Sequence, residues 1–263
     1  CVFSYFAFFF HDSSYYFIKT TWLSYYGDFD YSLLGALKDG AWGCFYNGSS
    51  PYNPVLWTMQ TEILGSFLIY TLCFFHFKFK SILFPFLSVF FIVLFIHLKV
   101  INPKLGLGLI SFVFGYFVFF YGKTLSNYTS VFMLLLGLYL SGAHNTSVSY
   151  RFIYFFLNGI TREVCCFFAG LILVYVCINS ELISKLLNNN YTLWMGKVSF
   201  SVYLLHMPVI YLFGFYFFEH FISLFGSYYI SVFLCVFFVI FISCFLSVLF
   251  CKYIDGVSVI ISN

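Results

Sequence analysis

A single carboxylate lies inside the hydrophobic stretch Asn53–Phe75, which reads NPVLWTMQTEILGSFLIYTLCFF. Every residue from Val55 to Phe75 is uncharged except Glu62, so the stretch is typical of a membrane-spanning helix. Glu62 lies about 10 Å from the helix start, too deep for its short side chain to reach the interface. Because a charge at the centre of a spanning helix costs roughly 2.5–3.5 kcal/mol, we expect Glu62 to face a bundle interior or a water-filled cavity.

Polar side chains recur on this helix at every fourth position, namely Thr58, Glu62, Ser66 and Tyr70. Residues four apart share one face of a helix. The sequence therefore predicts one polar stripe that the remaining helices enclose.

The composition places the chain in the membrane class. Of its 263 residues, 62% are hydrophobic and 8% are charged, whereas a soluble domain carries about 25% charged residues. These charges are too few to coat a water-facing surface, so we expect an integral, multi-pass protein whose partner is the lipid bilayer. A net charge of +3 without a basic patch gives no support for a nucleic-acid partner.

The nine cysteines do not indicate a metal centre or a disulfide framework. Most lie in or at the ends of apolar helices, where Cys behaves as a small hydrophobic residue. No C-x-x-C pair or Cys/His ligand spacing occurs. We predict no metal site and no bound cofactor.

Apolar runs predict seven full spans, at Asn53–Phe75, Ile82–Leu98, Leu105–Tyr121, Tyr128–Ala143, Val164–Ile178, Val198–Phe218 and Tyr228–Cys251. Cys1–Phe10 is interpreted as the tail of a truncated first helix, followed by a polar-aromatic connection, His11–Tyr52. Phe152–Leu157 is apolar but too short to span, so we expect an interfacial helix there. The predicted fold is an all-α, polytopic transmembrane helix bundle, a single domain over residues 1–263 whose first helices lie upstream.

A second informative stretch, Met195–Ile210, reads MGKVSFSVYLLHMPVI. Ser199, Tyr203 and His206 fall at i, i+4 and i+7, on one face of a helix. Pro208 removes a backbone donor, which predicts a bend beside His206. A neutral imidazole both donates and accepts protons, and a membrane-buried one is a functional candidate.

Purely structural interpretations remain open for these residues. His206 could tie two helices together, and Glu62 could make a helix-to-helix hydrogen bond. Trp57 stands at a helix start, where an aromatic residue often only marks the membrane interface.

Together the two stretches resemble the acyltransferase-3 family of polytopic membrane acyltransferases. The first element is Trp57-Thr-Met-Gln-Thr-Glu62, and the second is Met195-Gly-Lys-Val-Ser-Phe-Ser-Val-Tyr-Leu-Leu-His206-Met-Pro208. A degraded form of the family's last element stands at Tyr253-Ile-Asp255-Gly-Val. The resemblance covers the chain from about Pro51 onward.

One family feature has no counterpart here. In the family, ten residues separate the proposed catalytic His from a basic residue in the first helix. No Lys or Arg precedes a His at that spacing here, although for His11 the position to be tested falls just before Cys1 and cannot be read. We expect this motif upstream of Cys1, so the fragment alone is expected to be inactive.

The resemblance implies transfer of an acyl group, often acetyl, from an acyl-CoA donor to a hydroxyl of a carbohydrate, lipid or small molecule. Trp57, Glu62, Ser199, Tyr203 and His206 would then shape the cavity or orient the substrate. The rival class is a transporter or channel that uses the same intramembrane polar residues, although no internal repeat supports it. A receptor-like seven-helix protein is favoured only by the helix count.

Overall fold

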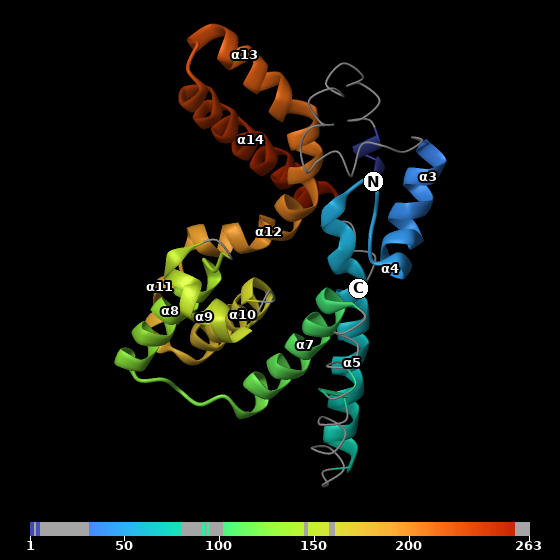
Figure 1. Cartoon of the computed structure of the whole chain (residues 1–263). Coiled ribbons are helices and arrows are strands. Elements are labelled where there is room, and N and C mark those ends of the chain that lie inside the picture. Colours follow the sequence, from blue (N-terminus) through green and yellow to red (C-terminus); the bar gives the residue numbers. More distant parts are fainter. Residues whose placement is uncertain are drawn as a thin grey trace. The chain divides into compact units, whose positions relative to one another are not determined.

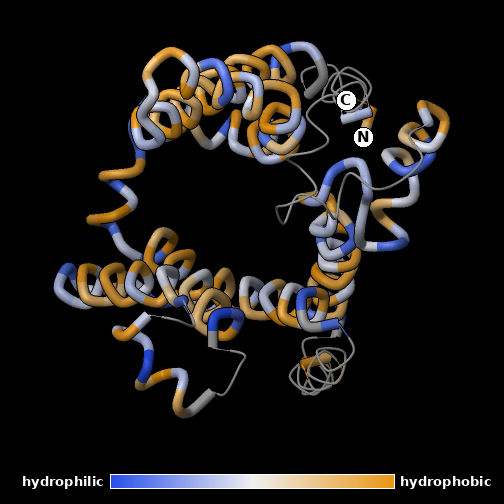
Figure 2. Tube along the Cα trace, turned by 45° about the horizontal axis from the view of Figure 1, so that its top comes forward, coloured by the Kyte–Doolittle hydropathy of each residue, from blue (hydrophilic) through white to orange (hydrophobic). Residues whose placement is uncertain are grey.

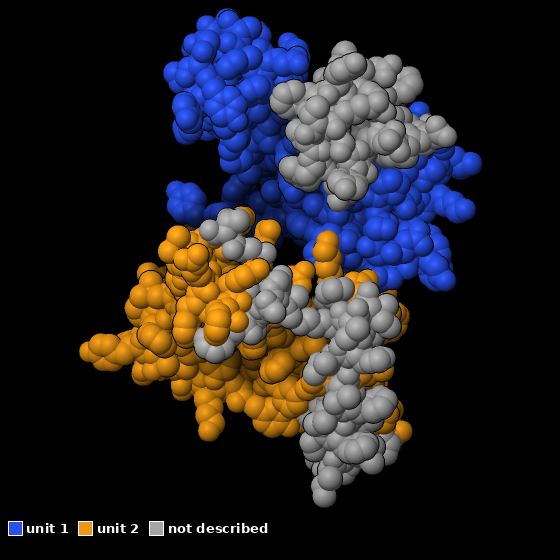
Figure 3. All heavy atoms as spheres, viewed as in Figure 1, with its two compact units in different colours: residues 1–60, 191–263 blue, residues 61–190 orange. Residues whose placement is uncertain are grey.

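The computed structural model describes residues 1–2, 4–5, 32–79, 91–92, 94, 102–144, 147–157 and 161–255. Within these ranges the regular elements are all helices (Figure 1), which confirms the all-α class. The chain divides into two compact units, residues 1–60 with 191–263 and residues 61–190 (Figure 3). The predicted single domain stays a prediction.

Five helices of the described part are long and apolar enough to cross a membrane, at Pro54–Lys78, Lys104–Tyr121, Arg162–Asn179, Asn190–Phe225 and Tyr228–Tyr253. They contain α5 (Trp57–Phe79), α7 (Pro103–Tyr121), α10 (Thr161–Asn179), α12 (Asn190–Val209) with α13 (Phe215–Phe225), and α14 (Tyr228–Phe250). Each overlaps a predicted span.

The predicted count of seven spans stays a prediction. The span expected at 128–143 is α8 (Asn127–Ser141), whose 15 residues are fewer than the about 20 that a bilayer requires. The span expected at 82–98 and the tail expected at 1–10 lie mostly outside the described residues. The segment expected as an interfacial helix contains a short helix, α9 (Arg151–Leu157), which follows the turn η4 (Val148–Tyr150). Its place at a membrane interface stays a prediction.

Two segments predicted as connections contain helices. Residues 33–47 form α3 (Leu33–Lys38), η2 (Asp39–Gly43) and α4 (Cys44–Asn47). The polar segment before residue 198 forms α11 (Glu181–Leu187) and the first two turns of α12. Hydropathy marks only the part of a helix that suits lipid, whereas capping groups decide where its hydrogen bonding begins.

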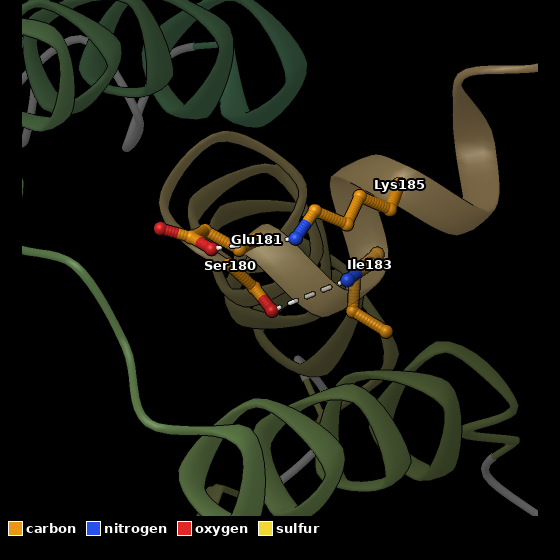
Figure 4. A network of polar contacts seen from close by, with 4 residues as sticks. All are labelled: Ser180, Glu181, Ile183 and Lys185. Carbon is orange, nitrogen blue, oxygen red and sulfur yellow. Dashed lines mark hydrogen bonds and ion pairs between the residues drawn. The ribbon is translucent and has the colours of Figure 1, made fainter.

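The cap of α11 illustrates how a polar sequence forms a helix (Figure 4). Ser180 is buried, and its hydroxyl accepts a hydrogen bond from the backbone N–H of Ile183 at 3.3 Å. Glu181 and Lys185 form an ion pair at 3.6 Å, but both side chains are exposed. An exposed pair contributes at most about 1 kcal/mol, so the cap is the stronger determinant of the helix start.

In the unit of residues 61–190, α5 and α7 pack through small residues. A Cβ on Gly108 would overlap the methyl group of Thr61, and a Cβ on Gly65 would overlap the ring of Phe112. The two glycines therefore let the helices approach closely, as small residues do in membrane bundles. The core beside them comprises Leu68, Leu72, Leu109, Ile110, Val113 and Tyr116.

In the other unit, α12 leads through the π-helical turn η5 (Ile210–Gly214) into α13. Figure 1 shows the helix axis changing direction between the α12 and α13 labels, as Pro208 predicted. Gly226, at φ +61°, ends α13, and its N–H donates to the carbonyl of Ile222 at 3.0 Å. With Ser227 it forms the two-residue connection to α14, which packs against α13 (Figure 1).

Large apolar side chains cover much of the helical surface. Hydrophobic residues predominate along the long helices (Figure 2). Phe67 on α5, Phe119 on α7 and Phe233 on α14 are 67%, 76% and 70% exposed. Continuous apolar surface of this kind is unfavourable in water and suited to lipid.

Two substitutions on α7 test the close helix approach. Gly108→Ala should lower the free energy of unfolding by about 1–3 kcal/mol because its methyl group overlaps Thr61. Gly115→Ala is the matched control, since no described atom lies within 4 Å of its Cβ position; it should be neutral or stabilise by up to about 1 kcal/mol. Unfolding in mixed lipid–detergent micelles gives both values. Equal losses for the two variants would contradict the packing.

Candidate functional site

Pro208 leaves one backbone carbonyl of α12 without its usual partner. In an α-helix the carbonyl of Leu204 would accept a bond from the N–H of residue 208, but proline has none. The side-chain amide of Asn53 takes its place, with Nδ2 donating to the Leu204 oxygen at 2.9 Å. Asn53 is only 2% exposed, so this bond satisfies a buried amide together with the carbonyl of the partly buried Leu204.

Asn53 is held in position by its own neighbours. Its Oδ1 accepts from the N–H of Val55 at 3.3 Å, which caps η3 (Pro54–Leu56) at the entrance to α5. Its backbone N–H donates to the hydroxyl of Ser50 at 3.3 Å. Ser50 in turn donates to the carboxylate of Asp39. A buried polar chain thus runs from η2 to α12.

Tyr203 makes a second link between the same two segments. Its hydroxyl donates to the carbonyl of Val55 at 2.7 Å and lies 3.3 Å from Oγ1 of Thr58. The start of α5 and the C-terminal half of α12 are therefore joined by two polar contacts. The two sequence elements singled out above meet at this point.

The hydrogen bonds of His206 fix its tautomer. Nδ1 lies 2.7 Å from the carbonyl oxygen of Tyr203 and 3.2 Å from that of Val202. Carbonyl oxygens only accept hydrogen bonds, so Nδ1 carries a proton, and in the neutral form of the ring the lone pair is on Nε2. The ring is half-buried and lies 5.9 Å from the ring of Tyr203. His206 can therefore accept a proton or a hydrogen bond at Nε2.

Two pockets flank α12 within this unit. The first, here named the α14 pocket, has a volume of about 570 Å³ and is lined by Val202, His206, Ile210, Gly214, Phe215, Phe218, Tyr228, Val232, Cys235, Val236, Val239, Ile240, Ser243 and Cys244. The second, the Asn53 pocket, has about 610 Å³ and includes Cys44, Asn53, Leu204 and Pro208 in its wall. The α14 pocket contains the imidazole.

Cys44 is not suited to nucleophilic chemistry in the Asn53 pocket. Burial, with a further contribution from Asp39, raises the pKa of its thiol. A thiol is an effective nucleophile only as the thiolate. Its hydrogen bond to the carbonyl of Gly40, at 3.8 Å, fits a structural role.

The other predicted site residues are placed as follows. Trp57 is half-buried as the first residue of α5. Ser199 is exposed, and its hydroxyl donates to the carbonyl of Gly196 in its own helix at 2.8 Å. Glu62, Ser66 and Tyr70 are exposed on the part of α5 that belongs to the other unit. The polar chamber that the sequence predicts around Glu62 and His206 stays a prediction.

Comparison with known proteins decides the family. A family model described as an acyltransferase domain, Acyl_transf_3, matches residues 1–250. The chain belongs to the acyltransferase-3 family. No curated protein and no solved structure matches it. In this acyltransferase-3 chain, the element beginning at Trp57 and the element ending at Pro208 both lie within the match, whereas Tyr253-Ile-Asp255 lies beyond it.

Sequence reasoning missed Asn53 as a site residue. The pair Asn53-Pro54 is a capping signature, with an Asx acceptor followed by proline at the first helical position. That signature predicts the start of a helix, and it contains no information about the carbonyl of Leu204, 151 residues away.

A double-mutant cycle tests the Asn53–Leu204 bond. Asn53→Ala should destabilise the wild type because it leaves the Leu204 carbonyl unsatisfied as well as removing a cap. In a Pro208→Ala background, the new N–H satisfies Leu204, so Asn53→Ala should remove only the cap. We expect a coupling free energy of about 1–3 kcal/mol from unfolding in mixed micelles. Strict additivity of the two substitutions would refute the assignment.

Proposed function

We propose that this protein transfers an acyl group from an acyl-CoA donor to a hydroxyl of a carbohydrate, lipid or small molecule within a membrane. Membership of the acyltransferase-3 family supports the reaction class. The observation that carries the assignment to this region is His206, a half-buried imidazole whose tautomer leaves Nε2 open beside a pocket.

The reaction needs few groups. The acceptor oxygen attacks the thioester carbonyl, a C–O bond forms, the C–S bond breaks, and the acceptor's proton ends on the departing thiol. A general base for the hydroxyl and a water-poor site are the physical requirements. No Lys or Arg stands at the family spacing before His76, His97, His144, His206 or His220, so we assign the family's base to none of these five.

The residues of this region are proposed to bind and orient. His206 accepts a hydrogen bond at Nε2 from a substrate hydroxyl. Nδ1 of His206 donates to the backbone carbonyl of Tyr203. The side chain of Tyr203 is in turn held by the hydrogen bond from its hydroxyl to the carbonyl of Val55. Trp57, Ser199 and Glu62 keep the cavity-shaping roles that the family resemblance implies.

Two substitutions at His206 separate its nitrogens. His206→Asn retains a donor near the position of Nδ1 but has no group at Nε2, whereas His206→Gln places an amide near Nε2. If Nε2 orients the acceptor, transfer should fall about 10–100-fold in the Asn variant and less in the Gln variant. The assay follows radiolabelled acyl groups from acyl-CoA into membrane acceptors, using the full-length protein. Wild-type rates in both variants would remove His206 from the site.

Glu62→Gln tests the second predicted residue. The amide is nearly isosteric but carries no charge, so transfer should fall about 10–100-fold if the carboxylate binds or orients substrate. Ser66→Ala, one turn further along the same exposed face, is the control and should keep wild-type transfer. An unchanged rate for Glu62→Gln would exclude the carboxylate from the reaction. Substrate flux into sealed vesicles without covalent change would favour a transporter over an enzyme.

A further inference from the structure

The α14 pocket is an apolar channel between two helical walls. One wall presents Val202, His206, Ile210, Gly214 and Phe218, which recur every fourth residue through α12, η5 and α13. The other wall is α14, whose lining side chains include the hydrocarbon groups of Val232, Val236, Val239 and Ile240. This lining suits an apolar ligand.

The antiparallel register places two polar groups at one end of this pocket. Sγ of Cys235 contacts the carbonyl oxygen of Gly214 at 3.1 Å, which fixes these residues opposite each other. Eight residues before Gly214 is His206, and eight residues after Cys235 is Ser243. At the other end, the rings of Phe218 and Tyr228 lie 5.9 Å apart. His206 and Ser243 thus share the polar end.

Ser243 is an orphan polar group. Its side chain is 3% exposed, and its hydroxyl has no hydrogen-bond partner among the described residues. A helical serine in an apolar environment usually donates to the carbonyl four residues earlier, as Ser231 of the same helix does to Ser227 at 2.7 Å. An unpaired buried hydroxyl is unfavourable, so Ser243 is a donor that lacks an acceptor in the described part of the chain.

Gly214 provides room in the middle of the pocket. A Cβ built there would meet only Ile210 and Val239, at 3.5 Å or more. A methyl group therefore fits, whereas a larger side chain would extend into the pocket volume. The glycine leaves space for a ligand rather than for a neighbouring helix.

We propose that the α14 pocket binds the hydrocarbon chain of a medium- or long-chain acyl donor, with the thioester carbonyl at the His206–Ser243 end. This inference rests on the proposed function and specifies its donor. The hydroxyl of Ser243 donates to the carbonyl, and Nε2 of His206 receives the acceptor hydroxyl. A bare hydrocarbon tail of a bilayer lipid would leave both groups unpaired, which favours a chain that carries a carbonyl at its end.

Photolabelling tests the binding directly and does not depend on turnover. The full-length protein in nanodiscs is irradiated with dodecanoyl-CoA that carries a diazirine on its terminal carbon, and the labelled peptides are mapped. We expect labelling within residues 210–240 that excess dodecanoyl-CoA suppresses. Shorter competitors should lose about fourfold in potency for each methylene removed.

Four variants define the pocket. Gly214→Leu and Val239→Trp fill it and should reduce labelling at least tenfold, whereas Gly214→Ala should stay within twofold of the wild type. Ser243→Ala removes the donor without adding volume and should weaken labelling about tenfold. Circular dichroism and unfolding midpoints identify any variant that fails to fold. If Val239→Trp fails to fold, the comparison of Gly214→Leu with Gly214→Ala still tests the pocket.

The outcomes separate this inference from the proposed function. Competable labelling of the pocket that Gly214→Leu abolishes supports the inference, even if no acyl transfer is found. Transfer activity without competable labelling overturns the donor pocket and leaves the function standing. Labelling that excess dodecanoyl-CoA does not reduce indicates non-specific partition of the probe from the bilayer and also overturns the inference.

Discussion

The arrangement around α12 depends on how the carbonyl of Leu204 is satisfied. Pro208 withdraws the donor that an α-helix would offer to this carbonyl, and lipid offers no water in its place. Asn53 supplies the donor from the entrance to α5, so a local defect in one helix becomes a specific contact between two segments. The contact of Tyr203 with Val55 follows in the same place, and the orientation of His206 follows from the carbonyl of Tyr203.

The helix bend after Pro208 lies next to the pocket that His206 lines. Beyond Pro208 the helix widens into η5 and continues as α13, and α14 then runs back beside α13 (Figure 1). The pocket between them contains His206 where the bend begins. In a straight helix His206 would lie on the same face. The residues of η5 and α13 that follow it would, however, not line a pocket together with α14. The proline thus matters through the packing it permits.

The sequence predicted much of the fold because apolar length is a strong signal. The span expected at 105–121 is α7, which begins at Pro103 behind the cap of Asn102. The first two turns of α12 escaped prediction because Asn190, Thr192 and Lys197 interrupt the apolar pattern there, so hydropathy does not mark them as part of a span. At the site, the helical spacing of Tyr203 and His206 was correct, and their rings are neighbours. Helical spacing could not identify Asn53 or Ser243. Asn53 matters because it donates to the distant carbonyl of Leu204, and Ser243 matters because its buried hydroxyl has no partner among the described residues.

The short connection at Gly226 and Ser227 has a consequence for how such chains can diverge. It is the only covalent element that sets the phase of α14 against α13, because each added residue rotates a following helix by about 100°. An insertion of a single residue there would turn the Ser243 face toward lipid and bring a different row of side chains to the wall. Changes of length at this hairpin would therefore alter ligand selectivity abruptly, whereas substitutions along the wall would alter it by degrees.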